Sequence, residues 1–437
     1  MGVSKVDFAG NTLVDLTGDS VTPATLKKGE TAHNAAGEQI VGTMEAGGTT
    51  PGAPGDITFY DYDGTIVTSW TLEELATKTA LPDYPSHDGL ICQGWNWSLA
   101  DLKTAKQKMN VGTMYITDDG KTRIYIHLEE GRTSPMLGCN PNGTVSVDWG
   151  DGTTPDTLTG TGSTQYTPNH NYAAPGDYMI TLTAVSGTFS FYGSSATNQY
   201  SALLRYVSGA NAVNVAYLNC IRSVEIGNNV DAILAYAFEY CYSLKTITIP
   251  SSVSRIHQNV FNNCYSLQYV CVPNGVEYID NMAMQNCSSL RAVSIPKSVT
   301  SLGQSVFYNC YSLLSVRLTS SVSTIGSSAF ESCFALQEVN VPKGLTAFST
   351  NTYYLCRGLT HVKIPGTVTT ISNRTFYYCY GMKYYDFTEH TSIPTLSGAQ
   401  VFSGIPMDCE IRVPLSIVDA WKAATNWSRY AAYIVGV

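Results

Sequence analysis

Seven of the 12 cysteines in this 437-residue chain are spaced 23 residues apart. Thiols can bind a metal ion, but structural metal sites use cysteine pairs separated by roughly two to four residues, and no such pair occurs here. Stacked repeats would bring successive thiols close together, yet side chains in register rarely reach the dihedral angle of a disulfide. We therefore expect a column of small buried thiols and no metal, cofactor or catalytic residue among them. The seven cysteines are Cys241, Cys264, Cys287, Cys310, Cys333, Cys356 and Cys379.

Apolar residues repeat around each cysteine with the same period. In the first unit Leu244 lies three residues after the cysteine, Ile247 and Ile249 alternate with polar residues, and Pro250 follows. The alternation predicts a short strand with one inward face, and proline ends it because it has no N–H donor. One such unit cannot bury its own apolar face, so several must stack on a shared core. The sequence therefore predicts a solenoid of 23-residue turns.

The unit resembles the leucine-rich repeats of the BspA-like type. The match is nearly position for position over Ala237–Pro250, with the sequence AFEYCYSLKTITIP. We place the solenoid at residues 196–408, and residues 409–437, which leave the period, should form a strand and a helix that cap the stack. The asparagines before three of the cysteines should satisfy buried backbone groups. They are Asn263, Asn286 and Asn309.

Candidate binding residues lie in the columns that vary between units. The positions directly after the cysteines are mostly aromatic, and Tyr and Arg are enriched in binding hot spots. These side chains could form an exposed ridge along one edge of the solenoid, or they could pack against one another as filler. The candidates are Tyr242, Tyr265, Tyr311, Phe334, Arg357 and Tyr380. The outward-facing row of the strands is a second candidate, for which solvated surface is an equally good explanation. It contributes Arg317, Asn340, Lys363 and Asp386.

Residues 56–112 are expected to form a small α+β module. Strands at residues 56–60 and 66–70 would pair as a hairpin, with Asp63-Gly64 in the turn. Thr71 followed by Glu74 is a capping box that opens a helix, and Ser98 opens a second one.

The hairpin contains the segment Asp61-Tyr62-Asp63-Gly64-Thr65, which resembles the nucleophile loop of haloacid-dehalogenase-type phosphatases. That resemblance implies that Asp61 attacks phosphorus, that Asp63 is the acid/base, and that Mg²⁺ bridges them. That fold requires alternating strands and helices well beyond this module, whereas the following residues are β-rich. We therefore interpret the segment as a turn, and a Mg²⁺-dependent phosphatase is the distant alternative.

Residues 113–195 alternate like a β-sandwich and resemble an immunoglobulin-like domain of the PKD type. The matching segments are Val147–Gly152, His170–Tyr172 and Pro175–Tyr178. The resemblance implies a spacer or adhesive module. Two carboxylates, Asp148 and Asp151, are few for a calcium shell of roughly six to eight oxygens, so a role in turns is expected.

The N-terminal residues 1–46 contain a stretch, Val21–Met44, that resembles a segment common near the start of phage tail-fibre and related virion proteins. The resemblance implies an arm for attachment and oligomerisation, and such fibres are usually homotrimers. Residues 47–55 form a Gly/Pro linker.

Composition excludes several classes of function. The net charge of −9 and the lack of a basic run argue against a nucleic-acid partner. No run of about 18 apolar residues could span a membrane, and the N-terminus has no apolar signal-peptide core.

We therefore expect a multi-domain, mainly β, non-enzymatic adhesion protein at a virion surface or in the extracellular space. It would bind a bacterial cell-surface protein or glycan through the solenoid, and other virion proteins through the arm. The alternative is a bacterial BspA-like cell-surface adhesin that binds a host or bacterial protein or glycan.

Overall fold

The computed structural model describes residues 56–105, 107–163, 166–191 and 219–437, and a few short strands outside these ranges. The chain divides into two compact units, Met1–Ala53 and Pro54–Val437. In the first unit β1 (Lys5–Phe8) pairs with β2 (Asn11–Asp15), and β3 (Thr31–His33) pairs with β4 (Gln39–Val41), both antiparallel. The predicted arm (1–46) and linker (47–55) otherwise lie outside the described residues.

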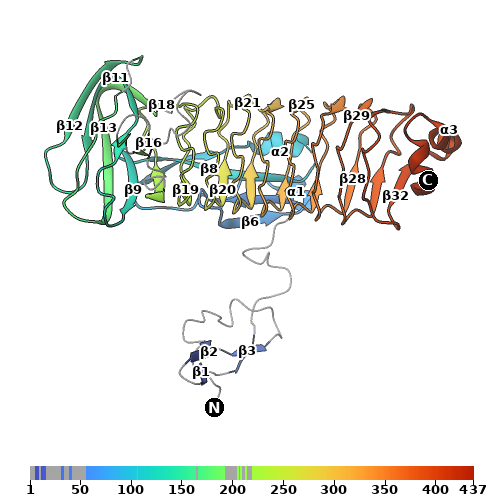
Figure 1. The fold of residues 1–437 in the computed structure, drawn as a ribbon, viewed down its shortest axis with the longest axis horizontal. Coiled ribbons are helices and arrows are strands. Elements are labelled where there is room, and N and C mark those ends of the chain that lie inside the picture. Colours follow the sequence, from blue (N-terminus) through green and yellow to red (C-terminus); the bar gives the residue numbers. More distant parts are fainter. Residues whose placement is uncertain are drawn as a thin grey trace. The chain divides into compact units, whose positions relative to one another are not determined.

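The second unit is mainly β and contains a solenoid of about 9 turns of ~23 residues, as predicted (Figure 1). Each turn adds one strand to a parallel sheet, and Val270 pairs with Val293 of the next turn. The strands, in spatial order, are β20 (Tyr269–Cys271), β22 (Ala292–Ser294), β24 (Ser315–Val316), β26 (Glu338–Val339), β28 (His361–Lys363), β30 (Tyr384–Asp386), β32 (Glu410–Val413) and β33 (Ile434–Gly436).

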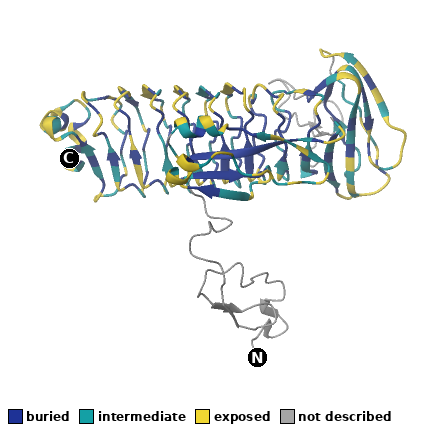
Figure 2. Cartoon of the chain, turned by 180° about the vertical axis from the view of Figure 1, so that it is seen from behind, coloured by how far each residue is buried: buried dark blue, intermediate teal, exposed yellow. Residues whose placement is uncertain are grey.

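Two shorter parallel ladders form where the chain returns in each turn. The first consists of β21 (Tyr278–Ile279), β23 (Ser301–Leu302) and β25 (Thr324–Ile325). The second consists of β27 (Ala347–Phe348), β29 (Thr370–Ser372) and β31 (Thr395–Ser397). A continuous apolar interior lies between the ladders and the main sheet. Figure 2 shows buried residues in the successive turns of the solenoid.

The solenoid interior is built from columns of like residues. The rings of Phe330 and Tyr353 stack at 5.2 Å, and the same contact recurs in other turns. All 12 cysteines are free thiols, and the seven of the column are buried. Each thiol after the first donates to a backbone oxygen of the preceding turn, as Cys264 Sγ does to Phe238 O at 3.1 Å. Burial raises the pKa of Cys287 to about 12, so this thiol stays protonated at neutral pH.

Each turn bends at two residues that have left-handed backbone conformation, one and five residues before the cysteine. Asparagine tolerates this conformation better than most residues. Asn286 has a φ of 61°, and its Nδ2 donates to Asn263 Oδ1 at 2.8 Å. Asn309 donates to Asn286 Oδ1 at 2.9 Å in the same way. The asparagine amides therefore donate to one another along the ladder. This corrects our expectation that they would satisfy buried backbone groups.

A second sheet precedes the solenoid and is continuous with it. Its strand order is β12-β11-β13-β9-β17-β19, and β18 also pairs with β13. The bounds are β9 (Thr122–Leu128), β11 (Cys139–Asp148), β12 (Asp156–Thr161), β13 (Gly176–Phe191), β17 (Ile221–Glu225), β18 (Val230–Ile233) and β19 (Thr246–Ile247). Short pairs are formed by β10 (Met136–Leu137) with β14 (Leu204–Arg205) and by β15 (Val207–Ser208) with β16 (Ala212–Val213).

This sheet closes the N-terminal end of the solenoid. The ring of Phe191 on β13 meets that of Phe238 in the first cysteine-containing turn at 5.6 Å, and one apolar core runs through both parts. Asp148 and Asp151 accept backbone hydrogen bonds from residues two further along, as turn-forming carboxylates do. The resemblance to a PKD-type domain stays a prediction.

The module at the start of the second unit has a four-stranded sheet of order β6-β5-β8-β7. Its elements are β5 (Ile57–Tyr60), β6 (Ile66–Trp70), α1 (Leu72–Thr77), β7 (Leu90–Trp95), α2 (Leu99–Ala105) and β8 (Met109–Thr117). The expected hairpin pairs β5 with β6, and the capping box of Thr71 and Glu74 is present. The boundary that we placed after residue 112 falls inside β8.

Behind the last turns, η3 (Leu415–Ile417), α3 (Val418–Ala423) and η4 (Ser428–Tyr433) cover the C-terminal end of the core. Trp421 and Trp427 are buried there, and both pack against Phe387. Trp427 Nε1 donates to Pro394 O at 2.7 Å, so the indole polar group is also satisfied.

Candidate functional site

The module covers part of the outward face of the solenoid sheet. Asn96 Nδ2 donates to Val272 O at 3.0 Å and to Ser294 O at 3.2 Å, while Trp97 Nε1 donates to Ile295 O at 3.1 Å. The Tyr60 and Tyr269 rings stack at 5.1 Å in a small apolar cluster between the two sheets. The face of β20 and β22 is therefore an internal interface.

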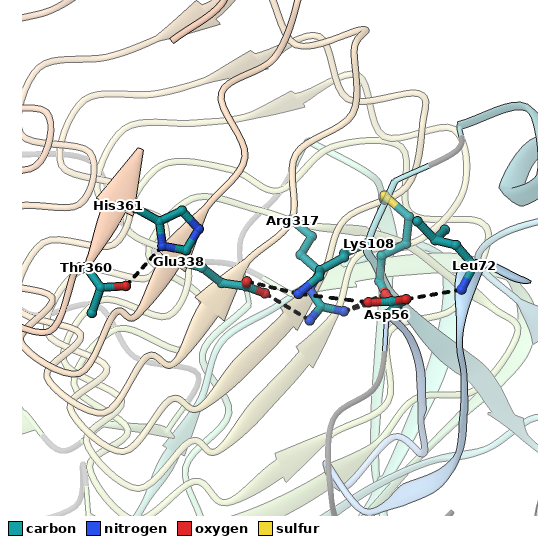
Figure 3. Close-up of polar contacts among 8 residues, drawn as sticks. Asp56, Leu72, Lys108, Arg317, Glu338, Thr360 and His361 are labelled. Carbon is teal, nitrogen blue, oxygen red and sulfur yellow. Dashed lines mark hydrogen bonds and ion pairs between the residues drawn. The ribbon is translucent and has the colours of Figure 1, made fainter. Parts of the chain in front are cut away.

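Arg317 belongs to this interface, which corrects its place among the candidate ligand-binding residues. It is 7% exposed. Its guanidinium donates to Asp56 O at 2.7 Å and to Glu338 Oε1 at 3.2 Å, and Lys108 reaches the other oxygen of Glu338 at 3.2 Å (Figure 3). Arg317 thus binds the module and is not available to an external ligand.

The other candidates of this row are distributed differently. Asn340 forms two hydrogen bonds with the backbone of Leu318, one through each end of its amide. Lys363 is exposed and forms an ion pair with Glu389 at 2.8 Å. The carboxylate of Asp386 accepts a hydrogen bond from the backbone N–H of Thr388. Each of these three side chains already has a partner within the solenoid.

The column directly after the cysteines forms a stacked edge. Tyr242 stacks on Tyr265 at 4.8 Å with an interplanar angle of 6°, and Tyr242 also packs against the core. Tyr311 stacks on Phe334 at 5.0 Å, and Arg357 lies 4.8 Å over the other side of the Phe334 ring and 5.9 Å from Tyr380.

Exposure separates the residues of this edge. Tyr265, Tyr311 and Tyr380 are 42%, 43% and 50% exposed, and Arg357 is also exposed, whereas Tyr242 and Phe334 are half-buried. Some side chains of the column therefore pack against their neighbours, whereas the three exposed tyrosines are accessible to a ligand.

The stack is interrupted at Ser288, the small residue of the column. There the surface opens into a pocket of about 480 Å³ lined by Tyr265, Asn286, Ser288, Asn309 and Tyr311. Three of these five residues were not among our candidates, because the two asparagines were assigned to the scaffold and Ser288 was not included in the predicted binding column. The available signal was a single small residue between aromatic neighbours at a fixed period.

The Asp61 loop is arranged as a structural turn. Asp61 is 4% exposed, and its carboxylate accepts from Tyr62 N at 2.8 Å and Thr113 Oγ1 at 3.1 Å. His87 Nε2 lies 2.7 Å from its second oxygen. Asp63 accepts from Thr65 N, which closes the hairpin turn. Across the described residues no three His, Cys, Asp or Glu side chains are grouped to hold a metal ion, and no helix is long and apolar enough to cross a membrane.

The period, the cysteine column and the parallel sheet agree with a family match. The model of the BspA type leucine rich repeat region matches residues 213–314 and 284–404, with 6 copies. The solenoid belongs to the BspA-type leucine-rich repeat family. No curated protein matches the chain.

Solved leucine-rich repeat structures are similar to the BspA-type solenoid. The leucine rich repeat protein of T. pallidum is 33% identical over 36% of this chain and 74% of that chain, with a TM-score of 0.34. A leucine-rich repeat protein from Bacteroides ovatus is 20% identical over 48% of this chain and 62% of that one, with a TM-score of 0.37. The pneumococcal vaccine antigen PcpA is 15% identical over 48% of this chain and 64% of its own, with a TM-score of 0.26.

Proposed function

We propose that this chain is a non-enzymatic adhesion protein whose BspA-type solenoid binds a cell-surface protein or glycan along the stacked edge. The observation that carries the proposal is the exposure of Tyr265, Tyr311 and Tyr380 on a rigid column. Side chains held by stacking lose little conformational entropy on binding, and tyrosine offers both an apolar ring and a hydroxyl. The scaffold columns beneath are buried and serve the fold.

The chemistry of the chain supports binding in preference to catalysis. The one motif with a catalytic resemblance has its carboxylate buried and bonded to Tyr62, Thr113 and His87. The cysteine-column thiols are buried and have raised pKa values, so they are poor nucleophiles. BspA-type repeat proteins are, in general, binding or adhesion proteins.

A cell-binding experiment tests the proposal. The full chain, fluorescently labelled, is incubated with a panel of bacteria and measured by flow cytometry. Replacing Tyr265, Tyr311 and Tyr380 together by Ser should reduce staining at least about tenfold, since tyrosine hot spots contribute about 2 kcal/mol or more each. The matched control replaces Tyr84 and Tyr278, which are 50% and 48% exposed away from this column. Staining by no bacterium, or equal staining by both variants, would contradict the proposal.

The finer form of the proposal is a phage or prophage virion protein, such as a tail fibre, attached through residues 1–46 and displayed as a homotrimer. Its support is the resemblance of Val21–Met44 to virion proteins. Removing residues 1–46 should then abolish incorporation into particles and trimer formation in light scattering, while the folded remainder still binds cells. A monomeric full chain found on the bacterial surface would favour the bacterial adhesin instead.

A further inference from the structure

The interruption of the aromatic column at Ser288 creates a slot between two parallel rings. Tyr265 stacks on Tyr242 on one side, so its other ring face is turned toward the position of residue 288. Tyr311 stacks on Phe334 of the following turn, so the other face of the Tyr311 ring is turned toward the position of residue 288. Both rings line the pocket.

The width of this slot is set by the repeat. Successive turns are one strand spacing apart, about 4.8 Å, so rings two turns apart are separated by about 10 Å. One flat ring placed midway would lie about 5 Å from each tyrosine, which is the centroid distance seen in the neighbouring stacks, 4.8 and 5.0 Å. The slot therefore has room for one inserted ring and no more.

The floor of the slot is polar. Asn286 and Asn309 line it, and the ladder uses one of the two N–H donors that each primary amide carries. Ser288 lies between the tyrosines, with its hydroxyl donating to Tyr265 O at 3.4 Å. A ligand in the slot would meet apolar ring faces on two sides and amide and hydroxyl groups beneath.

We propose that this slot binds one pyranose ring of a surface glycan. A pyranose has apolar C–H faces for the two tyrosine rings and equatorial hydroxyls that can pair with the asparagine amides. The pocket volume, about 480 Å³, lies in the range of small-molecule sites, about 300–1,000 Å³. This inference rests on the proposed adhesive function and names the ligand class at one point of the edge.

Planar aromatic ligands fit the floor of the slot or the charge of the chain less well. An aromatic side chain of a partner protein would stack between the rings but leave the amides of Asn286 and Asn309 unmatched, which is unfavourable on desolvation. A base of a nucleic-acid strand would bring the negatively charged phosphate backbone with it, and the chain itself carries a net charge of −9.

Saturation-transfer-difference NMR on the full chain tests the inference. The probes are the methyl pyranosides of glucose, galactose, mannose and N-acetylglucosamine at millimolar concentration, with N-acetyltyrosinamide as the aromatic competitor. The wild type should transfer saturation to ring C–H protons of at least one pyranoside. The Ser288→Tyr variant restores the aromatic column, so it should keep its melting temperature or raise it while the signal falls at least about tenfold. Tyr311→Ala should also lose the signal, and Tyr380→Ala should keep it.

The outcomes separate this inference from the proposed function. Binding of N-acetyltyrosinamide alone, no signal from any pyranoside, or full signal in a folded Ser288→Tyr variant would overturn the glycan slot. Cell staining that survives Ser288→Tyr but is lost in the triple tyrosine variant would leave the adhesive edge standing without the slot. Pyranoside binding without cell staining would reject the adhesive function while the slot stands.

Discussion

The Nη1 atom of Arg317 donates to the backbone oxygen of Asp56 at 2.7 Å, although the two residues are 261 positions apart in the chain. The bond joins the residue just before β5, the first strand of the module, to the middle of the solenoid sheet. Together with the bonds from Asn96 and Trp97, it fixes the module over the strands β20 to β26. The sheet face in this region is therefore structural, and ligand binding must be sought elsewhere on the solenoid.

Replacing Arg317 by Met should destabilise the second unit. The substitution keeps the length of the side chain but removes its bonds to Asp56 and Glu338, at an expected cost of about 3 kcal/mol. Urea unfolding followed by tryptophan fluorescence measures the change. Lys363→Met, at the same position two turns later and exposed, should cost less than about 1 kcal/mol. Equal effects of the two substitutions would contradict the interface.

Glu239 should make stability depend on pH. Burial raises the pKa of Glu239 from 4.5 to about 7, although Asn262 donates to it at 2.9 Å. The folded state therefore binds the carboxyl proton of Glu239 more tightly than the unfolded state does. The contribution of this protonation to the free energy of unfolding is complete below pH 4.5 and is lost as the pH rises through about 7. Glu239→Gln should be more stable than wild type at pH 8, by up to about 3 kcal/mol.

The pH prediction is checked by chemical denaturation at pH 4.5, 6 and 8. The difference between Glu239→Gln and wild type should grow with pH, while Glu130→Gln, an exposed carboxylate, should follow the wild type throughout. A difference that is constant across this range would show that Glu239 ionises at the same pH in the folded and unfolded chains.

The Asp61 loop should not hydrolyse phosphate esters. Its carboxylate is bonded to His87 and Thr113 and is 4% exposed, so it has no open face for a phosphorus atom. With Mg²⁺ and p-nitrophenyl phosphate, wild type and Asp61→Asn should show the same background rate. Asp61→Asn should instead cost about 1–3 kcal/mol of stability. Turnover that depends on Asp61 would reinstate the phosphatase alternative.

The solenoid could be predicted from sequence because its contacts repeat. A residue in one turn meets the equivalent residue 23 positions later, as Phe330 meets Tyr353, so a column of this kind is visible without any structure. The capping box of Thr71 and Glu74 is visible for a similar reason, since it depends on residues three apart. Local and periodic relations of this kind supplied most of the fold.

The docking of the module could not be predicted because its contacts are neither local nor periodic. Asn96 donates a hydrogen bond to Ser294, which is 198 residues away, and no regular spacing in the sequence predicts that contact. A weak signal existed in the outward row. Tyr269, Cys271 and Ala292 are apolar where a solvated row would be polar, whereas later turns carry His361 and Lys363. The exposure of the tyrosines in the column could not be predicted from the sequence either, because one ring can stack on its neighbour and still be exposed to solvent.

The point of entry of the chain has a mechanical consequence. The described part of the second unit begins at Asp56, and Arg317 holds this residue against the middle turns of the solenoid, not against either end. A force transmitted along the chain toward Asp56 is therefore delivered to the central turns. Several bonds between the module and the sheet would share that load before any one turn could peel away. The last turns, closed by Trp421 and Trp427, would meanwhile carry no tension from this attachment and could stay in register while the protein is pulled.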